Sequence, residues 1–162
     1  MGWAEQWGAR RMLSQSDVLH LHDRSTAEAI VARTGRRSGI ALVPHGHYLT
    51  AYPNTLTRQQ ARMRLGLDED AFLYLSLGLV RPYKGQEELL PAFSALTGPR
   101  LRLVIAGQPA SPDYALRLRS LAGTDGRITL DLRFVPSEEV QIYFNAANVC
   151  VYKNNKCSPP LP

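Results

Sequence analysis

The residues best suited to chemistry lie in one loop, within the stretch AFLYLSLGLVRPYKGQEELL at positions 71–90. Residues Ala71–Leu77 have the length and apolar character of a buried strand, and a helical pattern begins after Gly85. Between them, Arg81 and Lys84 supply two positive charges, and an arginine can bind two phosphate oxygens at once. The free N–H groups at the start of the following helix also favour an anion. This pattern predicts a diphosphate-binding loop.

The competing interpretation of this loop is a solvated turn that carries two basic residues, and the spacing alone leaves both interpretations open. Gly78 and Gly85 favour ligand binding, because glycine lets the backbone approach a ligand closely. The chain contains neither G-x-x-x-x-G-K-[ST] nor G-x-G-x-x-G. The sequence therefore supports neither a P-loop NTPase nor a dinucleotide enzyme of the usual type.

All four histidines fall in one short region of the chain, as His20, His22, His45 and His47. On a strand, His20 and His22 would place two imidazoles on the same face, as a metal-dependent hydrolase requires. No later set of His, Asp or Glu residues at other strand ends completes such a site. The alternative is that the histidines line a surface between domains.

The net charge of +5 and the isoelectric point near 9.5 raise the question of nucleic-acid binding. The arginines are scattered, however, and no basic run is interleaved with aromatic residues, so we expect no nucleic-acid partner. A basic surface that meets anionic lipid headgroups or a phosphorylated ligand fits at least as well. Trp3 and Trp7 lie one turn apart on a predicted helix that also carries Arg10 and Arg11. This helix could contact a membrane surface, but packing of the helix on a truncated domain is the simpler interpretation.

The sequence contains no targeting or spanning segment that we recognise. No run of about 18 apolar residues predicts a transmembrane helix, and the N-terminal residues lack the apolar core of a secretory signal. Cys150 and Cys157 do not have metal-site spacing. We therefore expect a reduced, cytoplasmic protein.

Strand and helix patterns alternate along the chain, which predicts an α/β fold built on parallel sheets. Predicted strands cover residues 17–22, 40–43, 71–77, 101–106, 127–132 and 148–152. Predicted helices cover residues 3–13, 26–33, 86–96, 112–121 and 137–146, with one more beginning after residue 57. In the 137–146 helix, Tyr143 and Phe144 are expected to pack in the core.

Two capping boxes mark helix starts along the chain. Ser25 with Glu28 predicts a helix start near residue 26, and Thr57 with Gln60 predicts another near residue 58.

The ordered motifs VPHGHY, ARMRLGL, GLVRPYKGQEELLPAF, LRLVIAG and FVPSEEVQIYFNAANVCVY closely resemble glycosyltransferase family 4. The resemblance covers residues 10–152 and implies a GT-B fold, in which the active site lies in a cleft between two Rossmann-like domains. Residues 1–46 would be the end of the N-terminal, acceptor-side domain with its crossover. Residues 47–152 would be the first part of the C-terminal, donor-binding domain.

The resemblance implies transfer of a sugar from a UDP- or GDP-linked donor to a saccharide or lipid-linked acceptor, with retention of configuration. It implies no metal or other cofactor, and a location in the cytoplasm or at the inner face of the membrane. The residues that match the family's donor diphosphate contacts are Arg81, Lys84, Gly78 and Gly85. Those that match its nucleoside contacts are Gly107, Phe134 and Val135, and those at its cleft are His45 and Gly46. No catalytic residue is assigned.

The sequence also departs from the family pattern. The family continues into a glycine-rich loop and a paired-glutamate motif, whereas residues 153–162 read KNNKCSPPLP, for which we expect disorder. Glu138 and Glu139 do not replace the pair, because they lie at an earlier helix start. We therefore expect a chain truncated at both ends that is inactive, or nearly so, by itself. A non-catalytic nucleotide-binding or interaction fragment is the remaining alternative.

Overall fold

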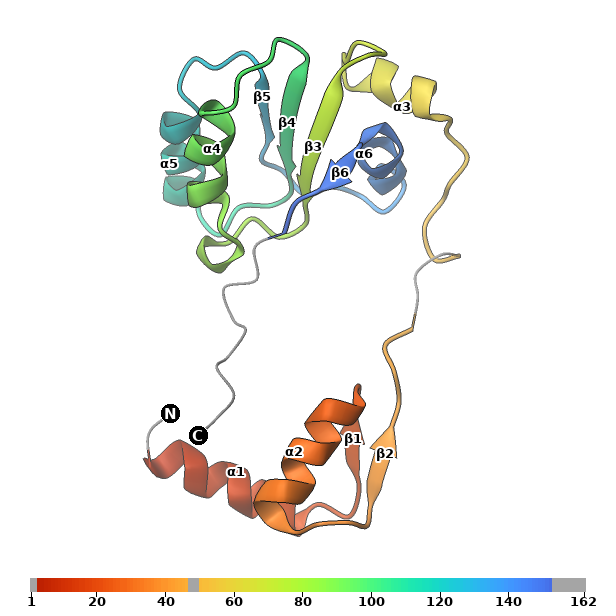
Figure 1. Cartoon of the computed structure of the whole chain (residues 1–162), viewed down its shortest axis with the longest axis vertical. Coiled ribbons are helices and arrows are strands. Elements are labelled where there is room, and N and C mark those ends of the chain that lie inside the picture. The colour runs from red at the N-terminus through yellow and green to blue at the C-terminus, as the bar shows by residue number, and fades with distance from the viewer. Residues whose placement is uncertain (1–2, 47–49, 153–162) are drawn as a thin grey trace. The chain divides into compact units, whose positions relative to one another are not determined.

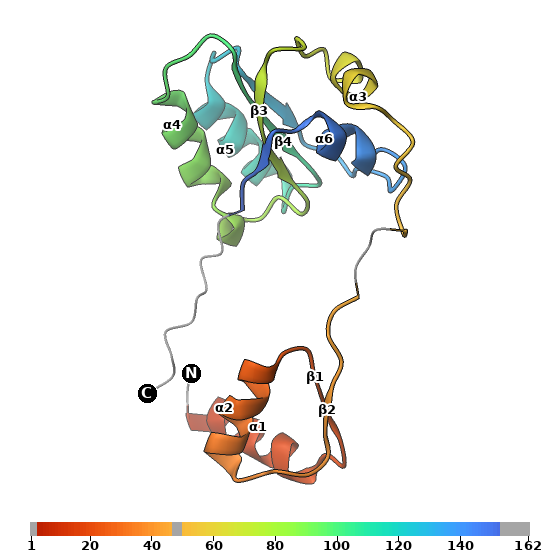
Figure 2. The same cartoon turned by 45° about the vertical axis from the view of Figure 1, so that its right-hand side comes forward.

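A computed structural model of the 162-residue chain describes residues 3–46 and 50–152. The chain divides into two compact units, Met1–Leu49 and Thr50–Pro162, which Figures 1 and 2 show from two directions. Both units combine helices with parallel strands, so the predicted α/β class is confirmed. Segments 47–49 and 153–162, which hold His47 and the expected disordered tail, lie outside the described residues. In the described part of the chain, no helix is long and apolar enough to cross a bilayer.

The first unit contains one βαβ arrangement preceded by a helix. Its elements are α1 (Trp3–Gln15), β1 (Leu19–Leu21), α2 (Arg24–Thr34) and β2 (Ile40–Leu42). The two strands pair in parallel, with Leu19 opposite Ile40. Each of these elements lies within two residues of its predicted position, because the apolar runs and the turn residues at their ends are local signals.

Helix α2 is capped differently from the prediction. Its N-cap is Asp23, whose carboxylate accepts the backbone N–H of Thr26 at 2.7 Å. The Ser25 hydroxyl donates to the same carboxylate instead of capping the helix, so the predicted Ser25–Glu28 capping box is wrong. A carboxylate accepts several hydrogen bonds at once and binds N–H groups more strongly than a hydroxyl does. The helix ends at Gly35, which has a φ of 71°.

Arg36 links the start of the first unit to its strands. Its guanidinium donates to backbone carbonyls at distances of 2.6 to 3.2 Å, and the acceptors are Leu13, Ser16, Asp17, Ser38 and Gly39. This basic side chain is therefore occupied with the fold and is not available to a ligand.

The second unit is built on a four-stranded sheet in the order β5-β4-β3-β6, with every pair parallel. Strands β3 (Phe72–Leu77) and β4 (Leu101–Ala106) pair along their full length. Strand β5 (Ile128–Asp131) lies beside β4, and β6 (Val149–Cys150) lies on the other side of β3. The four strands match the predicted runs, although β6 is shorter than predicted.

Helices cover both faces of this sheet (Figure 1). Helices α3 (Arg58–Arg64) and α6 (Val140–Ala146) pack on one face, and α4 (Gln86–Ser94) and α5 (Pro112–Ala122) pack on the other. Successive side chains of a strand alternate between faces. The first face buries Ala61, Leu73, Leu75, Val104, Ala106, Tyr143 and Ala146. The second buries Val80, Leu90, Phe93, Leu103, Ile105, Tyr114 and Leu118.

Residues of α3 show how this helix is fixed to the sheet. Thr57 and Gln60 form the predicted capping box at the start of α3. One turn later, Arg62 is only 3% exposed, and burial lowers the pKa of its guanidinium. It donates to the Asn148 side chain and to the carbonyls of Asp68, Glu69, Ala71 and Ala146. Arg62 therefore ties α3 to the beginnings of β3 and β6.

Helix α6 begins three residues later than predicted, since residues 137–139 form a turn. Tyr143 is buried at 2% exposure, as predicted, but Phe144 is 46% exposed, so its predicted core position is wrong. Adjacent residues of a helix point about 100° apart, and only one of the two can face the sheet.

Candidate functional site

The strand order changes direction at one place in the sheet of the second unit. The chain moves outward from β3 to β4 and β5, then returns to place β6 on the opposite side of β3. The order of the strands in the sheet therefore reverses between β3 and β6, which makes their carboxyl ends a topological switch point. In open parallel sheets, ligands bind outside the carboxyl ends of the strands at this switch point. We call this edge, where β3 to β6 end, the carboxyl edge.

The predicted phosphate loop, residues 78–85, lies at this switch point. It leaves β3 through Gly78, contains the 3-10 helix η1 (Pro82–Lys84), and ends at Gly85, whose φ is 76°. Gly85 is also the N-cap of the nine-residue helix α4, and it makes no side-chain capping bond. The first N–H groups of α4 therefore have no side-chain acceptor at the cap. Glu87 in the first turn pairs with Arg117 at 2.8 Å, which offsets part of its negative charge.

The two basic residues of the loop have no competing partner among the described residues. Arg81 and Lys84 are both partly buried, and neither makes an ion pair or a side-chain hydrogen bond within residues 7–46 and 50–152. The Lys84 Nζ lies 5.4 Å from the ring centroid of Tyr83. In contrast to Arg36 and Arg62, these cations remain available to an anion.

The loop after β4 supports the loop after β3 through two glycines. Gly107 is buried, and a Cβ on it would lie 2.8 Å from the carbonyl carbon of Gly78 and closer still to the oxygen. Two residues after Gly78, the backbone N–H of Val80 donates to the Gln108 carbonyl at 3.0 Å. The backbone N–H of Ala110 donates to the Val80 carbonyl at 2.9 Å. The backbone approach at Gly107 positions the phosphate loop. Its assignment as a nucleoside contact stays a prediction.

The predicted base-binding segment follows β5 at the same edge. Phe134 is 68% exposed, whereas Val135 is partly buried against the α3–α6 side of the sheet. This segment is held by four charged or phenolic side chains that sequence reasoning missed, namely Asp131, Arg133, Glu139 and Tyr143. Each comes from a different short element, so no local spacing indicated the cluster.

The Tyr143 hydroxyl donates to Asp131, and Arg133 pairs with both Asp131 and Glu139. Burial, followed by the hydrogen bond to Asp131, raises the pKa of Tyr143 to about 12. The hydrogen bond to Glu139 raises the pKa of Arg133. Both groups are already protonated at neutral pH, so the effect of the cluster there is structural: its hydrogen bonds and ion pairs fix the turn between β5 and α6.

A small pocket of about 30 Å³ opens beneath the phosphate loop. It is lined by Ser76, Leu77, Gly78, Leu79, Lys84, Gln86 and Tyr152. Gln86 is only 4% exposed, and its Oε1 has no hydrogen-bond partner in the described part of the chain. Sequence reasoning missed this residue. The sequence did contain a sign of its burial. Gln86 lies three positions before Leu89 and four before Leu90, which places it on the apolar face of the predicted helix.

The histidines belong to the first unit, and they do not form a metal site in the described part of it. His22 stacks on His45 at a centroid distance of 3.8 Å, and its Nδ1 lies 3.0 Å from the Val43 carbonyl. His20 lies 5.7 Å from His22. Within the described residues, no group of three or more His, Cys, Asp or Glu side chains could hold a metal ion. The cleft role of His45 and Gly46 stays a prediction.

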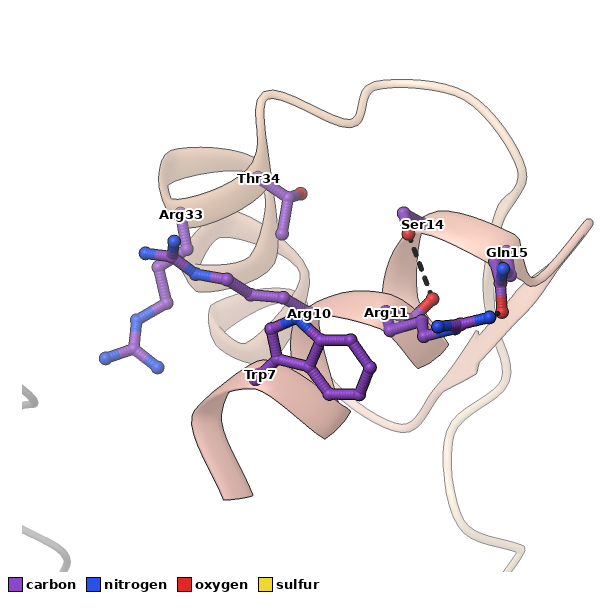
Figure 3. Close-up of a pocket in the computed structure, with 7 residues that line it drawn as sticks. All are labelled: Trp7, Arg10, Arg11, Ser14, Gln15, Arg33 and Thr34. Carbon is purple, nitrogen blue, oxygen red and sulfur yellow. Dashed lines mark hydrogen bonds between the residues drawn. The ribbon is translucent and has the colours of Figure 1, made fainter. Parts of the chain in front are cut away.

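The first unit also carries a basic hollow between α1 and α2 (Figure 3). Its lining consists of Trp7, Arg10, Arg11, Ser14, Gln15, Arg33 and Thr34. Trp7 is 56% exposed, and the Arg11 guanidinium lies 5.4 Å from its ring centroid. Trp7 therefore does not pack within the described part of the first unit, and both interpretations of this helix stay predictions. The Trp3 side chain lies outside the described part.

Comparison with known proteins identifies the second unit. Residues 57–156 match the family described as Glycosyl transferases group 1. The chain belongs to this family. As a group 1 glycosyl transferase, it is similar to GDP-mannose:glycolipid 4-beta-D-mannosyltransferase of Xanthomonas campestris, with 36% identity over 91 residues, 56% of this chain and 24% of that protein. It is also 30% identical over 156 residues to D-inositol 3-phosphate glycosyltransferase of Streptomyces bingchenggensis, covering 89% of this chain and 34% of the relative. This group 1 chain thus spans about a quarter to a third of the length of the curated relatives it matches.

Solved structures agree with the fold of a group 1 glycosyl transferase. The protein HepE of Anabaena, in complex with UDP and glucose, aligns with a TM-score of 0.72 at 16% identity, covering 95% of this chain and 42% of HepE. Sucrose-phosphate synthase of Thermosynechococcus elongatus aligns with a TM-score of 0.67 at 24% identity, covering 92% of this chain and 38% of the synthase. At these identities the likeness supports the parallel α/β fold, which is the class predicted from the sequence.

Proposed function

We propose that the chain binds a nucleoside diphosphate sugar at the carboxyl edge of the second unit and serves in transfer of the sugar to an acceptor. The observation that carries the proposal is the pair of available cations, Arg81 and Lys84, beside the uncapped start of α4 at the switch point of the sheet. A diphosphate is the part of such a donor that needs positive charge and free N–H groups.

The chemistry follows from where negative charge grows. When the bond between the sugar and the diphosphate breaks, charge accumulates on the leaving diphosphate. Arg81 and Lys84 would stabilise that charge by electrostatics, with no covalent step by either residue. In this proposal the two side chains and the helix N-terminus supply the positive charge that a divalent cation supplies in other transferases, and retention of anomeric configuration is part of the proposal.

The remaining assignments extend the same site. Gly107, Phe134 and Val135 would face the nucleoside, and His45 and Gly46 would lie at the cleft. The donor base stays open between uridine and guanosine. One relative is named for GDP-mannose and a glycolipid, and one solved structure contains UDP-glucose, which supports a donor of either kind. Another relative is named for D-inositol 3-phosphate, so a saccharide or lipid-linked acceptor stays a prediction. The expectation that this chain alone transfers little or no sugar stays a prediction, which a transfer assay with a labelled donor checks.

The direct test is calorimetric titration of the full chain with UDP and with GDP. Replacing both Arg81 and Lys84 by Ala removes two charge-assisted contacts, and we expect affinity to fall by about 100-fold or more. The matched control replaces Arg64 and Arg119 by Ala, because both are exposed cations on helices of the same unit and lie at the last turns of α3 and α5. The control should bind within about twofold of the parent. Equal nucleotide affinity of the parent and the Arg81/Lys84 variant would contradict the proposal.

A second proposal concerns the basic hollow of the first unit. An exposed Trp7 among Arg10, Arg11 and Arg33 suits an anionic membrane surface, because indole rings favour the headgroup region and arginines bind lipid phosphates. Vesicles of phosphatidylglycerol should shift the tryptophan emission to the blue, and vesicles of phosphatidylcholine should not. Replacing Arg10 and Arg11 by Gln should weaken the binding, and an unchanged titration would refute this contact.

A further inference from the structure

The small pocket under the phosphate loop is lined in part by Gln86, whose side chain carries a buried polar atom. Gln86 is the first residue of α4, directly after Gly85. Its Oε1 is buried without a hydrogen-bond partner in the part of the chain that the structure describes. Leaving a buried acceptor unpaired is unfavourable, and most such atoms are paired with protein, water or ligand. The orphaned oxygen therefore indicates a missing partner.

The size of the pocket limits what that partner is. A volume of about 30 Å³ holds one small group, such as a single water molecule or one hydroxyl that projects from a larger ligand. A complete sugar ring does not fit. The pocket also adjoins the proposed diphosphate site directly, because Gly78 and Lys84 of the phosphate loop are part of its lining.

The chemistry of the lining favours a hydroxyl. Lys84 can only donate hydrogen bonds, whereas the Oε1 of Gln86 can only accept them. A hydroxyl satisfies both, since it accepts from an ammonium and donates to an amide oxygen. Phosphate oxygens only accept at neutral pH, so they satisfy Lys84 but not Gln86 Oε1. In a nucleoside diphosphate sugar, the hydroxyl groups near the diphosphate belong to the transferred sugar and the ribose.

We propose that Gln86 is a specificity residue that accepts a hydrogen bond from a hydroxyl of the transferred sugar, while Lys84 contacts the same group or the neighbouring phosphate. This inference rests on the proposed donor binding and adds a contact that distinguishes the donor sugar from the bare nucleotide. The Gly78–Gly107 packing holds the loop over the pocket and so fixes the distance between the diphosphate and the hydroxyl.

The test compares nucleotides with and without the sugar on the full chain. Calorimetry with UDP and UDP-glucose, and with GDP and GDP-mannose, is run on the parent, Gln86→Leu and Gln86→Met. Both replacements have nearly the volume of glutamine but no oxygen acceptor, and the thioether sulfur of methionine accepts only weakly. The control is Gln59→Leu, since Gln59 is exposed on α3 and belongs to no part of the proposed site. We expect both Gln86 variants to bind the sugar nucleotide about tenfold more weakly and the bare nucleotide within twofold of the parent, and the control to change neither.

Several outcomes overturn the inference. An equal loss for bare and sugar nucleotide means that the amide meets the diphosphate through its NH2 group, and no loss for either means that a buried water molecule is the partner. Both leave the proposed function standing. If the Arg81/Lys84 variant binds UDP and GDP as the parent does, the proposed function fails as well. Thermal melting of each variant verifies folding, and an apolar residue at position 86 should not lower the melting temperature, because it removes an unpaired buried atom.

Discussion

The contact between Gly78 and Gly107 allows a sharp test of how the phosphate loop is positioned. In Gly107→Ala, the new Cβ would lie 2.8 Å from the Gly78 carbonyl carbon and would overlap its oxygen. The φ of Gly107 is 140°, a value that residues with a side chain rarely adopt. The variant therefore suffers both backbone strain and a clash with another backbone segment, which cannot be relieved by rotating a side chain.

The magnitude follows from these two costs and a matched control. A disfavoured φ costs about 1 to 3 kcal/mol, and overpacking adds about 1 to 3 kcal/mol. We expect the free energy of unfolding of Gly107→Ala to be lower than that of the parent by about 2 to 6 kcal/mol, a large part of the stability of a typical domain. Gly78→Ala is the control, because Gly78 has a φ of 131° but no heavy atom within 4 Å of the added Cβ. Its free energy of unfolding should fall only by the cost of the backbone strain, about 1 to 3 kcal/mol.

Amide hydrogen exchange is the suitable assay, because both tryptophans of the chain lie in the first unit and their fluorescence does not report on the second. Protection of the β4 amides should fall by about 30-fold or more in Gly107→Ala, which corresponds to about 2 kcal/mol. The loss in Gly78→Ala should be smaller. If the two variants lose the same protection, the clash is absent and the loop is not held by this contact.

Three further predictions concern the second unit. Arg62→Met should lower the free energy of unfolding by about 3 kcal/mol or more, because it leaves buried carbonyls unpaired. Urea denaturation measures this change, and a loss below about 1 kcal/mol would show that Arg62 does not stabilise the contact between α3 and the strands. The raised pKa of Tyr143, about 12 in the folded chain, means that its contribution to stability is complete below pH 10 and is lost as the pH rises to about 12. Unfolding measured across this range should show a steeper alkaline decline in the parent than in Tyr143→Phe, and equal slopes would refute the assignment. Thr57→Ala should cost about 1 kcal/mol through loss of the α3 cap, and an unchanged urea midpoint would show that the cap contributes nothing.

Much of the fold was predictable from the sequence because its signals are local. The apolar runs that became β3 and β4, and the capping box at Thr57, are each determined by a few adjacent residues. The start of α2 shows the limit of such signals. Asp23 and Ser25 are both good N-cap residues. An Asp23 cap accepts the Thr26 N–H, as in the structure, whereas a Ser25 cap would accept the Glu28 N–H, and local sequence does not decide between them.

The candidate site was only partly predictable for a related reason. Arg81 and Lys84 share one loop with Gly85, so their spacing made an anion site one of two interpretations, and the family resemblance favoured it. Gln86 and the Asp131–Tyr143 hydrogen bond acquire their meaning from burial and from contacts between separate elements. Sequence periodicity places Gln86 on the apolar face of a helix, but it does not reveal that the side-chain oxygen is left without a partner.

The most direct test of the central claim is a crystal structure of the full chain soaked with UDP or GDP. We expect the diphosphate at the carboxyl edge, within hydrogen-bonding distance of Arg81, Lys84 and the first N–H groups of α4. A nucleotide bound elsewhere with that corner empty, or both cations turned toward solvent beside a bound nucleotide, would contradict the assignment of the loop as the donor site.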